Sequence, residues 1–137
     1  MQGDDYCSLA SSGGGTVAAG DTKAFYRLVN RFPPTEKDYE STFARYERKG
    51  KFPPRWKKED FRISRGLSSY DTEDGAKRQW EESTGDQRYI VRYWLPESHS
   101  ELYERTFPRP GHYTLFAGKD ELDPFLDQDF QVALPRR

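Results

Sequence analysis

The sequence contains almost no cysteine, almost no histidine and no long apolar run. The single Cys7 cannot form an internal disulfide or a cysteine-based zinc cluster, and with only His99 and His112 in the chain no metal is expected. No apolar stretch approaches the ~18 residues that would cross a membrane. Asp4 and Asp5 stand where a secretion signal carries basic residues. These absences predict a cytoplasmic protein with no membrane partner.

Aliphatic side chains are scarce too, but aromatic ones are abundant. The 137 residues include 15 Leu, Ile and Val against 21 Phe, Tyr and Trp. A mean hydropathy of -1.06 would by itself suggest disorder, because few apolar residues leave little to bury. Each buried aromatic ring, however, removes roughly 150–250 Å² from water. The chain is therefore expected to fold around aromatic rings.

Charge is balanced overall but not locally. The totals, 22 basic and 23 acidic residues, give no whole-chain reason to expect nucleic acid or an anionic membrane. Residues 45–65 nevertheless carry nine Lys and Arg against three acids, and residues 119–131 carry one Lys against five acids. Such runs are usually solvated faces. They also suit a protein partner or a homodimer that pairs the two segments, or single-stranded nucleic acid stacking on aromatics within 45–65.

The chain divides into a tail, residues 1–22, and one α+β domain, residues 23–137. The tail is rich in Ser, Gly and Ala, as in a disordered linker. Its Gly13-Gly14-Gly15 run lacks the Lys-Ser/Thr that follows the glycines of a phosphate-binding loop.

A strand and a helix open the domain. Aromatic and β-branched residues over 24–30 predict a strand that Pro33 ends. Thr35 is then expected to cap one helix that ends at Gly50, because Tyr39, Phe43 and Tyr46 recur at helical spacing along a single stripe.

The remaining pattern alternates strands with short helices. Strands are expected at 66–70, 88–95, 101–107, 112–116 and 130–134, helices at 73–83 and 120–126, and an irregular or briefly helical segment at 51–65. This order predicts a small mixed or antiparallel sheet of about six strands, with two to three helices and an aromatic-rich core.

Few residues suggest nucleophilic or acid–base chemistry. His112 follows Gly111 at a strand entrance, where an imidazole can bind a ribose or act as a base. The chain has no Gly-x-Ser-x-Gly motif, and neither Ser68 nor Ser69 has a histidine at a fixed offset. A hydrolase triad is therefore not expected, and only the fold can bring a serine and a histidine together.

Three segments together resemble ADP-ribosyltransferase-like domains. They are Phe-Tyr-Arg-Leu-Val from residue 25, Gly-Leu-Ser-Ser-Tyr-Asp-Thr-Glu-Asp-Gly-Ala-Lys-Arg from residue 66, and Tyr-Ile-Val-Arg-Tyr-Trp-Leu-Pro from residue 89. The resemblance implies NAD as cofactor, with Arg27 holding its phosphate or carboxamide side. It also implies that Ser68, Ser69 and Tyr70 frame the nicotinamide pocket.

The family's catalytic glutamate has no clear counterpart. Its Glu-x-Glu or Gln-x-Glu pair is absent, which leaves Glu104 and Glu121 as candidates to stabilise the positively charged sugar, with His112 as a third catalytic candidate. The segment Gly-His-Tyr-Thr-Leu from residue 111 also resembles a small uncharacterised bacterial family.

Three functions therefore remain open. The first is an NAD-binding ADP-ribosyltransferase-like domain of a bacterial toxin or defence system. The second is a non-catalytic protein-interaction module or adaptor that uses the opposed charged segments. The third is a single-stranded nucleic-acid binder.

Overall fold

The computed structural model describes residues 21–83, 87–106 and 110–135; the expected tail lies almost wholly outside them. Six strands form one antiparallel sheet in the order β4-β5-β2-β1-β3-β6. Their bounds are β1 Thr22–Val29, β2 Leu67–Tyr70, β3 Tyr89–Pro96, β4 Tyr103–Arg105, β5 His112–Leu115 and β6 Leu126–Ala133. The predicted α+β class, with an antiparallel sheet of six strands, is confirmed.

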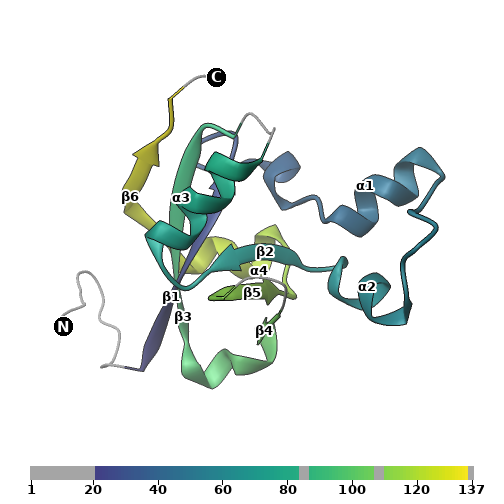
Figure 1. Cartoon of the computed structure of the whole chain (residues 1–137). Helices are drawn as coiled ribbons and strands as arrows, with labels where there is room; N and C mark the ends of the chain where they lie inside the picture. The colour runs from purple at the N-terminus through teal and green to yellow at the C-terminus, as the bar shows by residue number, and fades with distance from the viewer. Residues whose placement is uncertain (1–20, 84–86, 107–109, 136–137) are drawn as a thin grey trace.

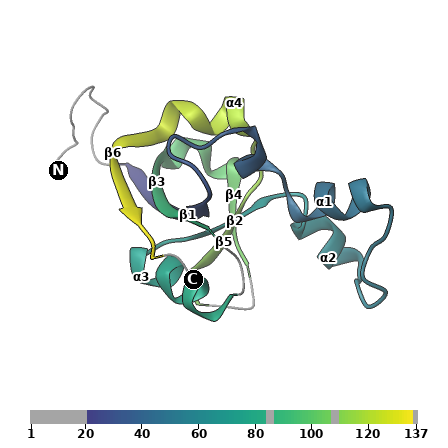
Figure 2. The same cartoon turned by 90° about the horizontal axis from the view of Figure 1, so that it is seen from above.

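Both faces of the sheet are covered (Figures 1 and 2). Alternation along β1 directs Phe25 and Val29 to one core and Tyr26 and Leu28 to another. Helix α3, Glu73–Glu82, covers one face. The other face is covered by α4, Lys119–Leu122, together with the 3-10 helices η2, Glu36–Tyr39, and η4, Asp123–Phe125. A further 3-10 helix, η3, Glu97–Leu102, precedes β4.

Aromatic side chains fill much of the first core, as the composition predicts. Phe25 is fully buried and contacts Tyr103 and Tyr113, with ring centroids 4.8 and 5.2 Å apart. Tyr93 on β3 is also fully buried. The predicted strand at 88–95 is interior, because β3 pairs with β1 on one side and β6 on the other.

Two helices, α1 Thr42–Lys49 and α2 Lys58–Ile63, project from the body as an arm, defined here as residues 41–65 (Figure 1). The arm has an aromatic cluster of its own, made of Phe43, Tyr46, Phe52, Trp56 and Phe61. The backbone N–H of Phe43 donates to Ser64 O at 2.9 Å and closes the base of the arm. Segment 51–65, expected to be irregular or briefly helical, thus contains a six-residue helix.

The prediction of one helix from Thr35 to Gly50 is wrong. Glu40 is extended, with φ -75° and ψ 121°, and separates η2 from α1. Ser41 starts the second helix, because its hydroxyl accepts from the N–H of Ala44 at 3.1 Å. The aromatic residues expected along one helical stripe therefore pack in two places. Tyr39 packs on the body, while Phe43 and Tyr46 pack within the arm.

Candidate functional site

The sheet opens where β2 leaves β1. These two strands share one registered pair, Tyr26 with Tyr70, whereas β1 pairs with β3 along all of Thr22–Val29. From Tyr70 back toward Leu67 the strands are not paired, and a hollow of about 560 Å³ lies beside this divergence. That volume is within the range of small-molecule sites.

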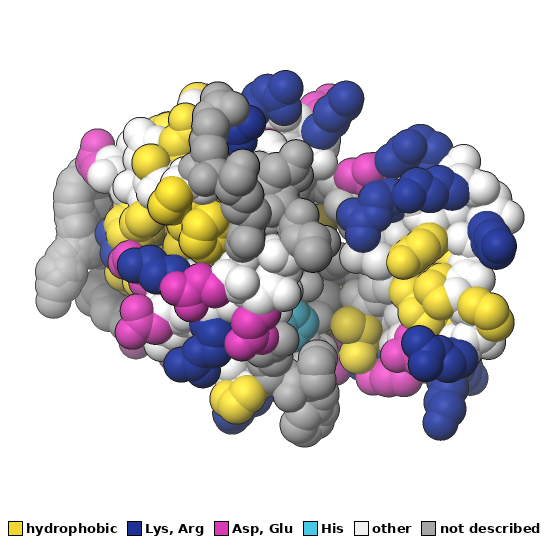
Figure 3. Space-filling view, turned by 45° about the horizontal axis from the view of Figure 1, so that its top comes forward, with side chains coloured by type: hydrophobic (Ala, Val, Ile, Leu, Met, Phe, Trp, Pro, Cys, Tyr) yellow, Lys and Arg dark blue, Asp and Glu magenta, His cyan; other side chains and the backbone are white. Residues whose placement is uncertain are grey.

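Several elements contribute polar side chains to this hollow. Its walls include Arg27 of β1, Ser68 and Tyr70 of β2, His112 of β5, and Glu40 and Arg45 at the start of the arm. A second hollow of about 190 Å³, between α2 and the sheet, shares Thr42, Gly66 and Ser68 with it. The two hollows form one cleft between body and arm, which are separate lobes in Figure 3.

Arg27 is the most unusual group in the cleft. Only 5% of the residue is exposed, yet within the described part of the chain its Nε and Nη1 atoms have no hydrogen-bond partner. Nη2 donates to the backbone oxygen of Asp38 at 2.6 Å, and the guanidinium lies 5.3 Å from the Tyr39 ring centroid. Buried donors are nearly always satisfied, and a buried charge is costly without a partner. Arg27 is therefore a buried cation with unused donors beside the hollow.

The nearest acidic residue does not neutralise Arg27. One oxygen of the Asp38 carboxylate accepts from the Asn30 N–H at 2.7 Å, and the other accepts from the Thr35 N–H at 3.0 Å. Among the described residues no carboxylate forms an ion pair with Arg27. Asp38 thus holds the turn that presents its backbone carbonyl, and its carboxylate does not pair with Arg27.

The ring of Tyr39 packs against the guanidinium of Arg27. Burial raises the pKa of the Tyr39 hydroxyl, and hydrogen bonds to Tyr93 at 2.7 Å and Asp123 at 2.9 Å raise it further. The phenol is therefore neutral at any physiological pH. Its ring face stabilises the cation of Arg27 without supplying a counter-charge.

Ser68 and His112 meet across β2 and β5. The Nε2 atom of His112 lies 3.2 Å from Ser68 Oγ, and its Nδ1 atom lies 2.7 Å from Thr106 Oγ1. His112 is 8% exposed, and its ring contacts the edge of Tyr70 at a centroid distance of 5.2 Å. The Tyr70 hydroxyl donates to Gln79 at 3.1 Å, so both rings are held firmly in the wall.

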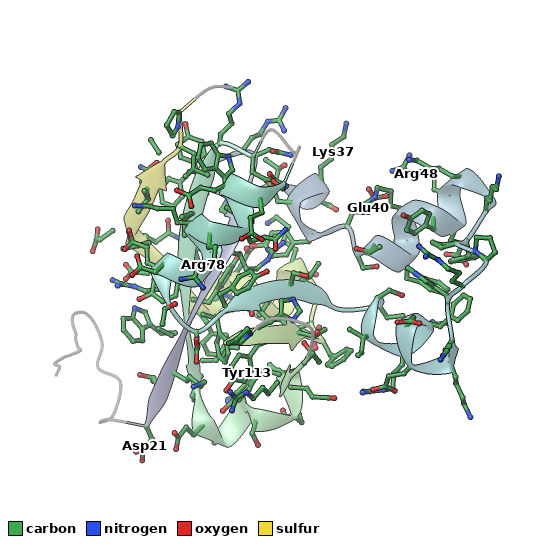
Figure 4. The ribbon with its side chains drawn as sticks, viewed as in Figure 1. Asp21, Lys37, Glu40, Arg48, Arg78 and Tyr113 are labelled. Atoms are coloured by element: carbon green, nitrogen blue, oxygen red, sulfur yellow. The ribbon has the colours of Figure 1, made fainter. Side chains whose placement is uncertain are left out.

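Glu40 is the one carboxylate in the wall of the larger hollow among the described residues. Arg48 binds it through Nε at 3.0 Å and Nη2 at 2.9 Å, a contact at the junction of arm and body (Figure 4). The hydrogen bond from Arg48 lowers the pKa of Glu40 below its usual range, against a smaller opposing effect of burial. Glu40 is therefore ionised at neutral pH.

Of the predicted site residues, Arg27, Ser68, Tyr70 and His112 come together. Glu104 and Glu121 do not, so the expectation that either lines the pocket is corrected. Both Glu104 oxygens are bound by Arg62 of α2 at 2.9 and 2.8 Å, which lowers the Glu104 pKa. Glu121 instead accepts from the Gly118 N–H at 2.9 Å and caps α4.

Ser69 also lies outside the hollow. The residues that line the hollow include Leu67, Ser68 and Tyr70 of β2 but not Ser69. Ser69 is fully buried and donates to the Tyr113 carbonyl at 3.2 Å. Its predicted role in framing the pocket is replaced by a structural one.

Sequence reasoning missed Glu40, Thr42 and Gln79 in the wall. The sequence contained a signal for the positions of Glu40 and Thr42, because Ser41-Thr42 in front of Phe43 is a typical helix start. Taking Thr35 as the only cap concealed this second start.

Comparison with protein-family models, with curated proteins and with solved structures finds no match to this chain. Among the described residues no helix has the length and apolar character needed to cross a membrane. Over the same residues no group of three or more His, Cys, Asp or Glu side chains is arranged to hold a metal ion.

Proposed function

We propose that the cleft binds NAD and that the chain is an ADP-ribosyltransferase-like domain. The observation that carries this proposal is the buried guanidinium of Arg27, with two free donors, in a hollow that also contains Ser68, Tyr70 and His112. NAD offers what that wall lacks: anionic phosphates, a carboxamide oxygen and ribose hydroxyls.

The phosphates, the nicotinamide and its ribose each have a complementary group in the wall. Arg27 binds a phosphate or carboxamide oxygen, and Arg45, exposed on the arm, attracts the phosphates. Tyr70 presents a fixed ring to the nicotinamide. The ionised Glu40 takes the role expected of Glu104 or Glu121 and stabilises the positive charge that develops on the sugar as nicotinamide leaves.

Calorimetric titration with NAD tests the proposal. The wild-type chain should bind NAD with a micromolar to millimolar Kd, and Arg27→Met should weaken binding by about 100-fold, as expected when a charge-assisted contact of about 2–3 kcal/mol is lost.

Arg78→Met is the matched control. Arg78 is exposed on α3 and absent from the wall of the hollow (Figure 4). Its replacement should leave the Kd unchanged. Equal effects of the two substitutions, or no heat from the wild-type chain at millimolar NAD, would refute NAD binding at Arg27.

A second candidate function is interaction with a polyanionic partner through the arm. On the arm, Lys and Arg side chains lie around exposed hydrophobic side chains (Figure 3). Two of the nine basic residues in 45–65, Arg48 and Arg62, are held by acidic residues. The others include Lys49, Lys51 and Arg55, which are exposed. Such a surface suits a single-stranded nucleic acid or the acidic segment 119–131 of a second copy.

Salt dependence distinguishes these partners. A labelled single-stranded oligonucleotide should bind at low salt, and its affinity should fall steeply as salt rises. Lys49→Ala with Lys51→Ala should weaken binding several-fold. Sedimentation at the same two salt concentrations reports on the homodimer: dimers at low salt with no oligonucleotide binding would favour self-association, and a monomer that binds no oligonucleotide would remove this candidate.

A further inference from the structure

Ser68 is an accessible hydroxyl where the two hollows meet. Its residue is exposed, and its side chain belongs to the walls of both hollows. Thr42 and Gly66 also border both hollows, but Gly66 has no side chain and no hydrogen bond links the Thr42 side chain to a base among the described residues. A ligand that enters from either side therefore meets the Ser68 hydroxyl.

A base lies behind this hydroxyl, and a third group orients the base. The chain of contacts runs from Ser68 Oγ to His112 Nε2 at 3.2 Å, from His112 Nδ1 to Thr106 Oγ1 at 2.7 Å, and from Thr106 Oγ1 to Thr114 Oγ1 at 2.9 Å. Two arrangements of protons satisfy these contacts. In one, Thr114 donates to Thr106, Thr106 donates to Nδ1, and Nε2–H donates to Ser68; in the other, Nδ1–H donates to Thr106, Thr106 donates to Thr114, and Ser68 donates to an unprotonated Nε2. The second arrangement makes His112 a base for Ser68. A nucleophile, a base and a group that holds the base are the parts of an activated serine.

The antiparallel register makes this arrangement rigid. Ser68 pairs with Thr114 and Tyr70 pairs with His112 across β2 and β5. The N–H of Thr106 donates to the His112 carbonyl at 2.9 Å, which fixes the third group against the base through the backbone as well. Side chains on strands hold geometry better than side chains on loops.

The protein contains an internal comparison. Ser98 Oγ lies 3.3 Å from Nδ1 of the adjacent His99, but both residues lie in η3, and neither borders the cleft. Ser98 is exposed, so it is accessible to reagents. Ser98 therefore has an imidazole nearby, but among the described residues no threonine orients that imidazole as Thr106 orients His112.

From this geometry we infer that Ser68 is a nucleophile that accepts the ADP-ribosyl group of NAD, so that the domain modifies itself. This inference rests on the proposed function. The Ser68 oxygen attacks the anomeric carbon of the nicotinamide ribose, the carbon–nitrogen bond breaks, and its electron pair leaves with neutral nicotinamide. The Ser68 proton passes to His112 Nε2 and then to water.

The product blocks its own site. The new bond is an alkyl glycoside, whose leaving group would be a serine alkoxide, so water does not displace it readily. The attached ADP-ribosyl group also fills the hollow. Each chain therefore releases one nicotinamide and then stops, which distinguishes self-modification from continuous NAD hydrolysis.

Intact-mass measurement on the full chain incubated with NAD tests this inference. The wild-type chain should gain the mass of one ADP-ribosyl group, mapped to Ser68 by peptide sequencing, and release one equivalent of nicotinamide. Ser68→Ala should form no adduct while binding NAD within a few-fold of wild type by calorimetry. His112→Gln should slow the adduct by about 100-fold or more, as loss of a general base does. Ser98→Ala should behave as wild type.

The outcomes separate this inference from NAD binding itself. Binding without an adduct at Ser68, or repeated turnover without an adduct, would overturn self-modification and leave the proposed function intact. Phenylmethylsulfonyl fluoride provides a readout that does not need NAD: it should sulfonylate Ser68 at least ten-fold faster than Ser98, and His112→Gln should remove the difference. Equal labelling of the two serines would overturn the activated nucleophile even if His112→Gln failed to fold.

Discussion

Arg27→Met should raise the free energy of unfolding by about 1 kcal/mol while it weakens NAD binding by about 100-fold. Methionine has about the length of the arginine stem and leaves no buried donor without a partner. In the wild-type chain two buried donors of Arg27 have no hydrogen-bond partner among the residues that the structure describes, and each costs about 1–3 kcal/mol. Against this gain stand one charge-assisted bond to Asp38 and the contact with the Tyr39 ring, which together contribute about 2–4 kcal/mol.

Denaturant unfolding of the two chains without ligand measures this difference. Arg78→Met, which changes an exposed arginine, should fall within about 0.5 kcal/mol of wild type. Opposite signs for stability and affinity are expected of a functional charge that the fold tolerates at a cost. An Arg27→Met chain that is less stable than wild type by more than about 1 kcal/mol would show instead that the guanidinium is structural.

Gly66→Ala should lower the free energy of unfolding by about 3 kcal/mol, at the upper end of the usual cost of overpacking. Gly66 connects α2 to β2 and is buried against β5. An added Cβ would overlap the Thr114 methyl group and would lie 2.9 Å from the Leu115 carbonyl oxygen and 3.1 Å from a ring carbon of Phe116. The carbonyl belongs to the sheet and cannot move without disturbing the pairing of β2 with β5.

Gly118→Ala is the control for this substitution. Nothing lies within 4 Å of a Cβ built on Gly118, and its φ of -97° suits any residue. Its effect should stay within about 0.5 kcal/mol. Thermal or denaturant unfolding compares the two variants, and equal stabilities would contradict the close packing at Gly66. Because Gly66 borders both hollows, its replacement should also weaken NAD binding.

The sequence predicted the elements of the sheet better than the contacts among them. Alternation and aromatic content located the strands near 24–30, 88–95 and 112–116, because these are local signals of burial. The break at Glu40 was missed because the spacing of Tyr39, Phe43 and Tyr46 is equally compatible with one helix and with two helical segments that pack separately.

The candidate site could be predicted only in part, because local sequence patterns do not specify contacts between residues that are far apart in the chain. Arg27, Ser68, Tyr70 and His112 could be listed as polar residues at strand ends. The contact between Ser68 and His112, however, joins residues 44 positions apart and depends on the register of β2 with β5. Glu104 was misplaced because a distant partner, Arg62, decides where its carboxylate lies.

The single registered pair between β1 and β2 has a mechanical consequence. It divides the sheet into two three-stranded halves, β4-β5-β2 and β1-β3-β6, which share little of the hydrogen-bonded ladder. If the proposed ligand binds between Arg27 and Ser68, it should contact both halves where β1 and β2 are not hydrogen-bonded to each other. Ligand binding would therefore stabilise the folded chain at the weakest seam of its sheet.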